Sequence, residues 1–299
     1  MELYHDNRGR ILLENEAISA ARNRRSWTRY LRRALLFVAV AYVGILLLLL
    51  ALESQFIFHP VTAEQSWQPP PDDSFQDISL TTSQGDRIHA WWIPRSGGNG
   101  VILYAHGNAG NLSHRGPAIK RWGQELNCAT LIFDYPGYGK STGKPTEAGC
   151  YAAADAAWDW LINEQKVDEE SVILVGASLG ASLAIDLAHK HTHRALVVLK
   201  GFTSIPDMAS DLFPWLPARY FVRTKFDNLS KIAECNGPVF FLHARNDSII
   251  PYRHTERLFE AAKEPKEFFT QESGDHNSAL PAEFFHRLKL FLEKHASLR

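Results

Sequence analysis

The sequence predicts an α/β protein with a mostly parallel, doubly wound sheet, preceded by one membrane-spanning helix. Five short aliphatic runs lack polar–apolar alternation, which is typical of strands buried on both faces. These runs are Val101–Ala105, Ala129–Phe133, Val172–Val175, Ala195–Leu199 and Val239–Leu242. Helical patterns separate most of them, at His114–Leu126, Thr146–Glu164, Ser178–His189 and Tyr252–Ala262. Strands that alternate with helices build βαβ units and hence a parallel sheet.

Length and composition are those of a folded globular protein. The chain has 299 residues, of which 45% are hydrophobic and 22% charged, so it is neither a disordered chain nor a disulfide-dense miniprotein. The formal net charge of −1 argues against nucleic acid as a partner, because nucleic acid favours a strongly basic domain. Residues 1–33 nevertheless carry eight arginines and four acidic residues. We interpret them as a basic arm with a role separate from that of the domain.

An uncharged segment, residues 34–52, follows the basic arm. A helix of this length is about 28 Å long, close to the hydrocarbon thickness of a bilayer. A cleaved signal peptide has a shorter apolar core, and a buried helix of a soluble domain has a polar face. We therefore interpret the segment as an uncleaved transmembrane anchor. Arginines before it and Glu53 after it predict a cytoplasmic N-terminus and a domain on the non-cytoplasmic side.

The rest of the chain divides into a spacer and one domain. Residues 53–74 are the predicted spacer, because residues 59–74 are polar and rich in proline, which is typical of a spacer. Residues 75–299 form the predicted domain. Two strands joined by a glycine-containing turn predict an antiparallel hairpin at one sheet edge, and a short strand and a helix end the domain. These four elements are Phe75–Thr82, Arg87–Pro94, Glu267–Thr270 and Pro281–Ala296.

A G-x-S-x-G motif marks the first candidate catalytic residue. It reads Gly176-Ala177-Ser178-Leu179-Gly180 and lies between a predicted buried strand and a predicted helix, the context in which this motif forms a nucleophile elbow. The sharp turn requires glycine where it packs closely, and it lifts the Ser178 hydroxyl clear of the sheet. The helix that begins there directs the Leu179 N–H at negative charge developing on a substrate. We predict Ser178 as the nucleophile.

A serine nucleophile needs a base and an orienting acid, which in this topology follow it in the order Asp, then His. Asp247 lies just after the run Val239–Leu242, and His276 lies in the loop before the last helix. Loops at the carboxyl ends of parallel strands carry the sites of such sheets, so we predict Asp247 as the acid and His276 as the base. Rival candidates lie in the 201–231 connection or inside predicted helices. They are Asp207, Asp211, Asp227, His254 and His286.

The loop after Val101–Ala105 is expected to supply the second oxyanion donor. It begins at His106 and reads HGNAGN. We predict the Asn108 N–H as this donor, with Ala109 as the alternative. No carboxylate or second histidine follows His106 at metal-ligand spacing, so we interpret its side chain as structural and predict no metal or other cofactor.

Six segments, in this order, resemble the alpha/beta hydrolases. They are HGNAGNLSHR, FDYPGYGKSTGKPTEAG, GASLG, FTSIPDM, DSIIP and GDHN. The resemblance spans about residues 75–296 and is strongest to membrane-anchored members with a small lid, often called alpha/beta hydrolase domain-containing proteins. That branch includes serine hydrolases of acyl esters and thioesters, and some members are peptidase-like. The resemblance implies the same functional residues, namely Ser178, Asp247, His276, Asn108 and Leu179. It also implies a structural role for Asp134, in the loop shaped by Gly137 and Gly139.

Two positions depart from the family pattern. Ala244 stands where glycine usually follows the histidine that precedes the acid, and alanine is expected to be tolerated unless its φ is positive. Lys200 and Gly201 stand before Phe202 where a residue such as proline is commoner. Because Lys200 lies near the sheet edge, we expect it to influence which substrate charge is accepted.

The connection at about residues 201–231 is predicted to be a small lid. Its apolar side chains are Met208, Leu212, Phe213, Trp215, Leu216, Tyr220, Phe221 and Phe226. Three interpretations stay open: these side chains bury one another, they form the wall of an acyl pocket, or they contact the bilayer.

These observations predict a membrane-anchored serine hydrolase that cleaves carboxylic esters or thioesters of small-molecule or lipid-like acyl substrates. A serine peptidase or amidase with the same triad is an alternative, because pocket shape selects the substrate. A catalytically silent, membrane-tethered binding domain is the alternative from another class. A pseudoenzyme usually lacks one member of the triad, whereas all three candidates are present here.

Overall fold

The computed structural model describes residues 12–297 and divides after Leu52 into two units. The first eleven residues of the predicted basic arm lie outside the described residues. The first unit contains helix α1 (Leu12–Ala51), whose 40 residues span about 60 Å. The helix continues without a break through residue 34, where we predicted the arm to meet the apolar segment. Over Ile18–Ala51 it is the one helix among residues 12–297 that is long and apolar enough to cross a bilayer.

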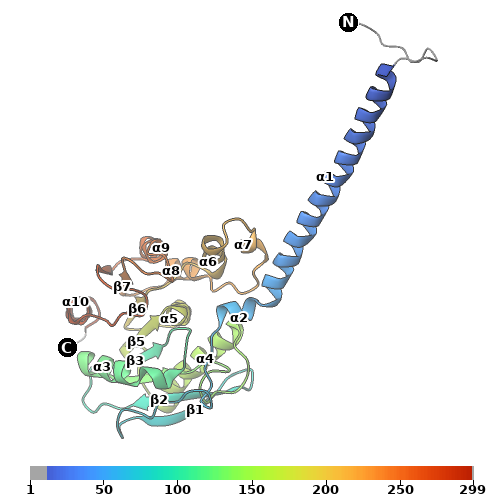
Figure 1. Ribbon diagram of the computed structural model, residues 1–299. Coiled ribbons are helices and arrows are strands. Elements are labelled where there is room, and N and C mark those ends of the chain that lie inside the picture. The colour runs from blue at the N-terminus through green and yellow to red at the C-terminus, as the bar shows by residue number, and fades with distance from the viewer. Residues whose placement is uncertain (1–11, 298–299) are drawn as a thin grey trace. The chain divides into compact units, whose positions relative to one another are not determined.

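The second unit is built on an eight-stranded sheet (Figure 1). Its strands are β1 (Gln76–Thr81), β2 (Arg87–Ile93), β3 (Val101–Ala105), β4 (Ala129–Phe133), β5 (Val172–Ala177), β6 (Ala195–Leu199), β7 (Val239–Ala244) and β8 (Lys266–Gln271), in the order β1-β2-β4-β3-β5-β6-β7-β8. Strand β2 pairs antiparallel with β1 and β4, and all other neighbours are parallel. The predicted mostly parallel sheet and its edge hairpin are confirmed.

Helices connect the strands much as the periodicity predicts. They are α2 (Glu53–Ile57), α3 (Gly116–Leu126), α4 (Glu147–Asp159), α5 (Leu179–Lys190), α6 (Ile205–Leu212), α7 (Ala218–Phe221), α8 (Asn228–Glu234), α9 (Arg253–Ala261) and α10 (Ala282–His295), with short 3₁₀ turns at Leu112–Arg115 and Glu169–Ser171. The predicted helix Thr146–Glu164 begins at its Thr146 cap and ends in a π-helical turn, Trp160–Glu164. The predicted lid consists of α6, α7 and the start of α8.

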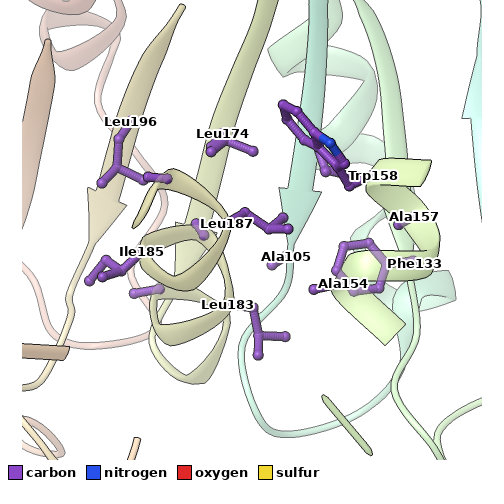
Figure 2. Close-up of a cluster of buried hydrophobic side chains, with 14 of the residues drawn as sticks. Ala105, Phe133, Ala154, Ala157, Trp158, Leu174, Leu183, Ile185, Leu187 and Leu196 are labelled. Atoms are coloured by element: carbon purple, nitrogen blue, oxygen red, sulfur yellow. The ribbon is translucent and has the colours of Figure 1, made fainter. Parts of the chain in front are cut away.

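Two layers of helices bury the faces of the sheet. Helices α3 and α10 cover one face, and α4, α5, α8 and α9 cover the other (Figure 1). Figure 2 shows part of the second layer, where Leu183 and Leu187 of α5 and Trp158 of α4 lie over sheet residues such as Leu174. Full burial of each such side chain stabilises the fold by about 1.5–3 kcal/mol. The non-alternating apolar runs are explained by these two layers, because both faces of the strands are covered.

The first part of the predicted spacer, residues 53–74, packs against the domain. After α2, Pro60 and Thr62 form isolated bridges to Gly110 and Gly139. Two backbone hydrogen bonds accompany them, from the N–H of residue 61 to the Gly110 carbonyl (3.2 Å) and from the N–H of residue 63 to the Gly139 carbonyl (2.8 Å). Both partners lie in loops that follow parallel strands. Residues 60–63 therefore pack on two loops at the carboxyl ends of the parallel strands.

Candidate active site

Ser178 lies in a sharp turn between β5 and α5. Its backbone has φ +53° and ψ −116°, a strained conformation for a residue with a side chain, and such strain concentrates at functional sites. The Ser178 N–H donates to the Leu199 carbonyl at the end of β6, 2.8 Å away. The two flanking glycines are required by close packing. A Cβ on Gly180 would lie 2.6 Å from the His106 carbonyl oxygen, and one on Gly176 would lie 2.6 Å from the Ala181 Cα.

Asp247 and His276 meet as the sequence predicts. They follow β7 and β8, which are neighbours in the sheet, and the His276 Nδ1 lies 2.8 Å from the Asp247 Oδ2. The Asp247 side chain is fully buried and that of His276 is 9% exposed. Because the Nδ1 of His276 contacts the carboxylate, its Nε2 is the ring nitrogen that can accept a proton from a reacting group. This is the arrangement of a base oriented by an acid.

Several donors hold Asp247 in its ionised form. The N–H groups of Ile249 and Ile250 donate to its Oδ1 at 2.9 and 2.8 Å, and His243 and His276 face its Oδ2. Burial raises the pKa of Asp247, but the hydrogen bonds from His243, His276 and Ile250 outweigh burial and hold that pKa far below its usual range. Asp247 is therefore ionised at neutral pH.

His243 is a buried neighbour of Asp247 that we did not predict from the sequence. It is fully buried in β7, and its Nε2 lies 2.9 Å from the Ile250 carbonyl oxygen and 3.3 Å from the Asp247 Oδ2. Its Nδ1 lies 2.7 Å from the Thr255 hydroxyl. The histidine before the acid is part of the family pattern, but only the fold shows that its ring contacts the carboxylate. The adjacent Ala244 ends β7 in extended conformation, so the expected tolerance of alanine is explained.

Lys200 supports the loop that carries His276. It follows β6, is 6% exposed, and its ammonium donates to the carbonyl oxygens of Asp275 (3.2 Å), His276 (2.6 Å) and Ser278 (3.3 Å). Burial lowers the pKa of Lys200, against the opposite effect of the carboxylates of Asp247 and Asp275. Our expectation that Lys200 influences which substrate charge is accepted stays a prediction, and its three contacts with carbonyl oxygens add a second role, which is support of the His276 loop.

The loop after β3 lies beside the Ser178 turn, because Ala105 pairs with Gly176 in the sheet. A Cβ built on Gly107 would lie 3.7 Å from the Ser178 Cβ, so the loop passes Ser178 at van der Waals distance. The Asn108 side chain holds this loop. Its Nδ2 donates to the Ile57 carbonyl (2.5 Å), and its Oδ1 accepts from the His59 N–H (3.1 Å) and from a tyrosine hydroxyl.

Asp134 and His106 brace the same loop from within the fold. Both are fully buried, and the His106 Nε2 lies 3.2 Å from the Asp134 Oδ1, which also accepts the Leu112 N–H at 2.8 Å. The His106 ring stacks on Tyr135 with centroids 4.3 Å apart. These contacts give both side chains the structural role that we predicted for them.

Comparison with known proteins decides the family. A sequence model of the alpha/beta hydrolase family matches residues 102–286. The chain belongs to the alpha/beta hydrolase family. An uncharacterised protein of Mycobacterium tuberculosis is 34% identical over 248 residues, covering 80% of this chain and 86% of that protein. Human alpha/beta hydrolase domain-containing protein 17B is 31% identical over 234 residues, covering 78% and 80%.

Solved structures of esterases share the fold of this hydrolase. An esterase of Pyrococcus furiosus superimposes with a TM-score of 0.65 at 19% sequence identity, covering 80% of this chain and 98% of that chain. An acetyl xylan esterase from Paenibacillus superimposes with a TM-score of 0.63 at 17% identity, covering 76% and 86%. At these identities the likeness extends to the fold alone.

Three of the five rival candidates, Asp207, Asp211 and His254, belong to one hydrogen-bond network between α6 and α9, which we call the second network. The His254 Nε2 lies 2.7 Å from the Asp211 Oδ2, and its Nδ1 accepts the Thr203 N–H at 3.2 Å. The Thr203 hydroxyl donates to Asp207 at 2.7 Å and is fully buried. This network ties lid helix α6 to α9. The two remaining rivals are Asp227, which caps α8, and His286, which lies exposed on α10.

Seven of the eight apolar side chains of the lid divide into two groups, and the eighth, Phe213, is half-buried. Leu216 and Phe226 are buried, and Met208 packs against the core. Four others are exposed at the tip of the lid, and they are Leu212, Trp215, Tyr220 and Phe221. The interpretation that the lid side chains simply bury one another therefore holds for only part of the lid.

Proposed function

We propose that this hydrolase is a serine esterase of small or lipid-like acyl substrates, with Ser178, Asp247 and His276 as its catalytic triad. The observation that carries the proposal is the contact between Asp247 and His276, at 2.8 Å, on the sheet edge where Ser178 occupies a strained elbow. The esterases that share the fold favour an ester as the substrate. Thioesters react by the same acyl transfer and belong to the proposal.

The proposed mechanism assigns one role to each of these groups. His276 takes the proton of Ser178 as the serine oxygen attacks the carbonyl carbon, and Asp247 holds the imidazole and stabilises its positive charge. The N–H groups of Asn108 and Leu179 donate to the oxyanion, a contribution worth about 10²–10³ in kcat for each donor. His276 then protonates the leaving group, and water, deprotonated by His276, releases the acyl group from Ser178.

We also propose that residues 34–52, which form the last part of α1 and the residue after it, anchor the protein in a membrane, with the basic arm cytoplasmic and the domain on the opposite side. Support comes from the length and apolar composition of the helix and from the arginines before and Glu53 after the apolar segment. Protease added outside sealed cells is expected to cleave the domain. Protection of the domain in intact cells, with cleavage after lysis, would contradict this orientation.

A fluorophosphonate probe tests the triad on the full-length protein. We expect labelling of the parent and none of Ser178→Ala. Asp247→Asn is expected to lose about 10⁴ in kcat, as loss of the orienting carboxylate does in a triad. Asp211→Asn is its matched control, because Asp211 also faces a histidine but lies in the second network, and it is expected to retain activity.

Three outcomes would contradict the proposal. An unlabelled, folded parent would favour a silent binding domain, and labelling of Ser178→Ala would place the nucleophile elsewhere. Hydrolysis of aminoacyl amides in preference to acyl esters and thioesters would make the protein an amidase with the same triad.

A further inference from the structure

Most of the strongly exposed apolar side chains of the domain belong to α2 or to the lid. In the described residues 53–297, seven large apolar side chains are exposed by 49% or more, and five of these belong to α2 or to the lid. The five are Phe56, Leu212, Trp215, Tyr220 and Phe221. Four of the five lie within residues 212–221, and exposed apolar side chains that lie close together mark an interaction surface. We call residues 212–221 the lid tip.

The chain that follows the lid tip is hydrogen-bonded to the residue after the apolar segment. The Glu53 carboxylate accepts the N–H of Arg223 (3.1 Å) and the N–H of Thr224 (2.7 Å). Glu147 accepts the next two N–H groups, of residues 225 and 226, at 2.6 and 2.7 Å. Two carboxylates thus hold four consecutive N–H groups.

This attachment links the lid to the residue at which the apolar segment ends. Glu53 is joined to Leu52, the last residue of the apolar segment, by one peptide bond. The backbone of residues 223 and 224 is therefore separated from that segment only by Glu53 and its hydrogen bonds. Aromatic packing of Phe58 against Phe226, with ring centroids 6.3 Å apart, reinforces the attachment.

The composition of the lid tip fits the headgroup region of a bilayer. Trp215 and Tyr220 are residue types enriched at membrane–water interfaces. Arg219 lies within the lid tip and Arg223 just after it, both are exposed, and arginine beside aromatic and aliphatic side chains is typical of interfacial segments that meet anionic lipids.

We propose that the lid tip docks on the bilayer in which α1 is anchored, with its apolar side chains in the headgroup region. The proposal rests on the membrane anchor proposed above. It assigns the exposed lid side chains to lipid rather than to a second copy of the chain.

The test uses full-length protein in vesicles of phosphatidylethanolamine and phosphatidylglycerol. Each variant gains one exposed cysteine that carries an environment-sensitive fluorophore. Trp215→Cys and Tyr220→Cys place the label on the lid tip, Leu290→Cys on α10 is the matched exposed apolar control, and Val43→Cys reports on the anchor. The native thiols compete little, because all three are free and buried and burial raises their pKa, to about 11 for Cys128 and to about 12 for Cys235.

Lipids with a nitroxide near the headgroup are expected to quench the lid-tip labels severalfold more than the Leu290 label, and lipids with a deep nitroxide to quench the Val43 label. Lid-tip labels quenched no more than the Leu290 label, with Val43 quenched, would overturn lid docking alone. Labels shielded from aqueous iodide but not quenched by lipid would indicate a second copy, and would also overturn it. An unquenched Val43 label would refute the anchor and lid docking together, while fluorophosphonate labelling of Ser178 still reports on the triad.

Discussion

Replacement of Lys200 by methionine tests whether a buried cation holds the His276 loop in place. Methionine keeps the apolar stem of lysine but removes the ammonium and its hydrogen bonds to the carbonyl oxygens of Asp275, His276 and Ser278. Only the bond to His276, at 2.6 Å, is short. Hydrogen bonds to a charged group contribute about 1.5–3 kcal/mol each, and burial of the ammonium offsets part of this.

We therefore expect a loss of about 2 kcal/mol in the free energy that orders the loop. If all of it falls on the placement of His276, kcat decreases roughly 30-fold, with KM little changed. The assay is hydrolysis of a soluble chromogenic ester by the full-length protein, with Tm measured in parallel.

Lys266→Met is the matched control. The Lys266 ammonium also donates to three carbonyl oxygens, those of Phe259, Glu260 and Ala262, at 2.8 to 3.3 Å, but it caps α9 and lies away from His276. We expect Lys266→Met to lower Tm without a decrease in kcat. An unchanged kcat in Lys200→Met, or an equal decrease in both variants, would refute a positioning role for Lys200.

The pH profile provides a second measure of Lys200. Burial lowers its pKa from the ordinary 10.5, although Asp247 and Asp275 act in the opposite direction. The ammonium is present below its pKa and is lost as the pH rises through that lowered value. The parent is therefore expected to lose activity at a pH below 10.5, and Lys200→Met to lack this alkaline decrease. A decrease at the same pH in both proteins would assign it to another group.

Three further predictions follow from single contacts. Gly180→Ala places a Cβ against the carbonyl oxygen of Ala105, so we expect loss of folded protein or of fluorophosphonate labelling. A labelled, stable variant would contradict the close packing. Asn108→Ala removes the side-chain bonds that hold the loop after β3, which we propose to supply an oxyanion donor, and kcat is expected to decrease about tenfold or more. An unchanged kcat would show that the loop is held by other contacts. Burial lowers the pKa of His193, outweighing its hydrogen bond to the His191 carbonyl, so the unfolded state binds this proton more readily. Stability is then lost as pH falls below 6.5, and His193→Asn, which keeps a donor but does not titrate, is expected to flatten Tm between pH 7 and pH 5 relative to the parent.

Local sequence patterns determine the strands of the sheet and which loops carry Ser178, Asp247 and His276. The five aliphatic runs form β3 to β7, within two residues of their predicted ends, because burial on both faces requires unbroken apolar residues. The G-x-S-x-G motif places Ser178 in its turn because only glycine tolerates the packing at positions 176 and 180. The order of Asp247 and His276 in the chain also sufficed to predict that they meet, since parallel strands end at one edge.

Only the tertiary structure decides how side chains from distant segments are used. The sequence shows Lys200 near the sheet edge, but its orientation depends on a loop 75 residues further along the chain. The contact of His243 with Asp247, and the packing of residues 58–63 on the loops after β3 and β4, likewise have no local periodicity to reveal them. The sequence does not distinguish the buried aromatic residues of the lid from the exposed ones, because hydrophobic composition does not specify a partner. The hydrogen bonds from the lid to Glu53 join residues 170 positions apart, and such pairing arises only when the chain folds.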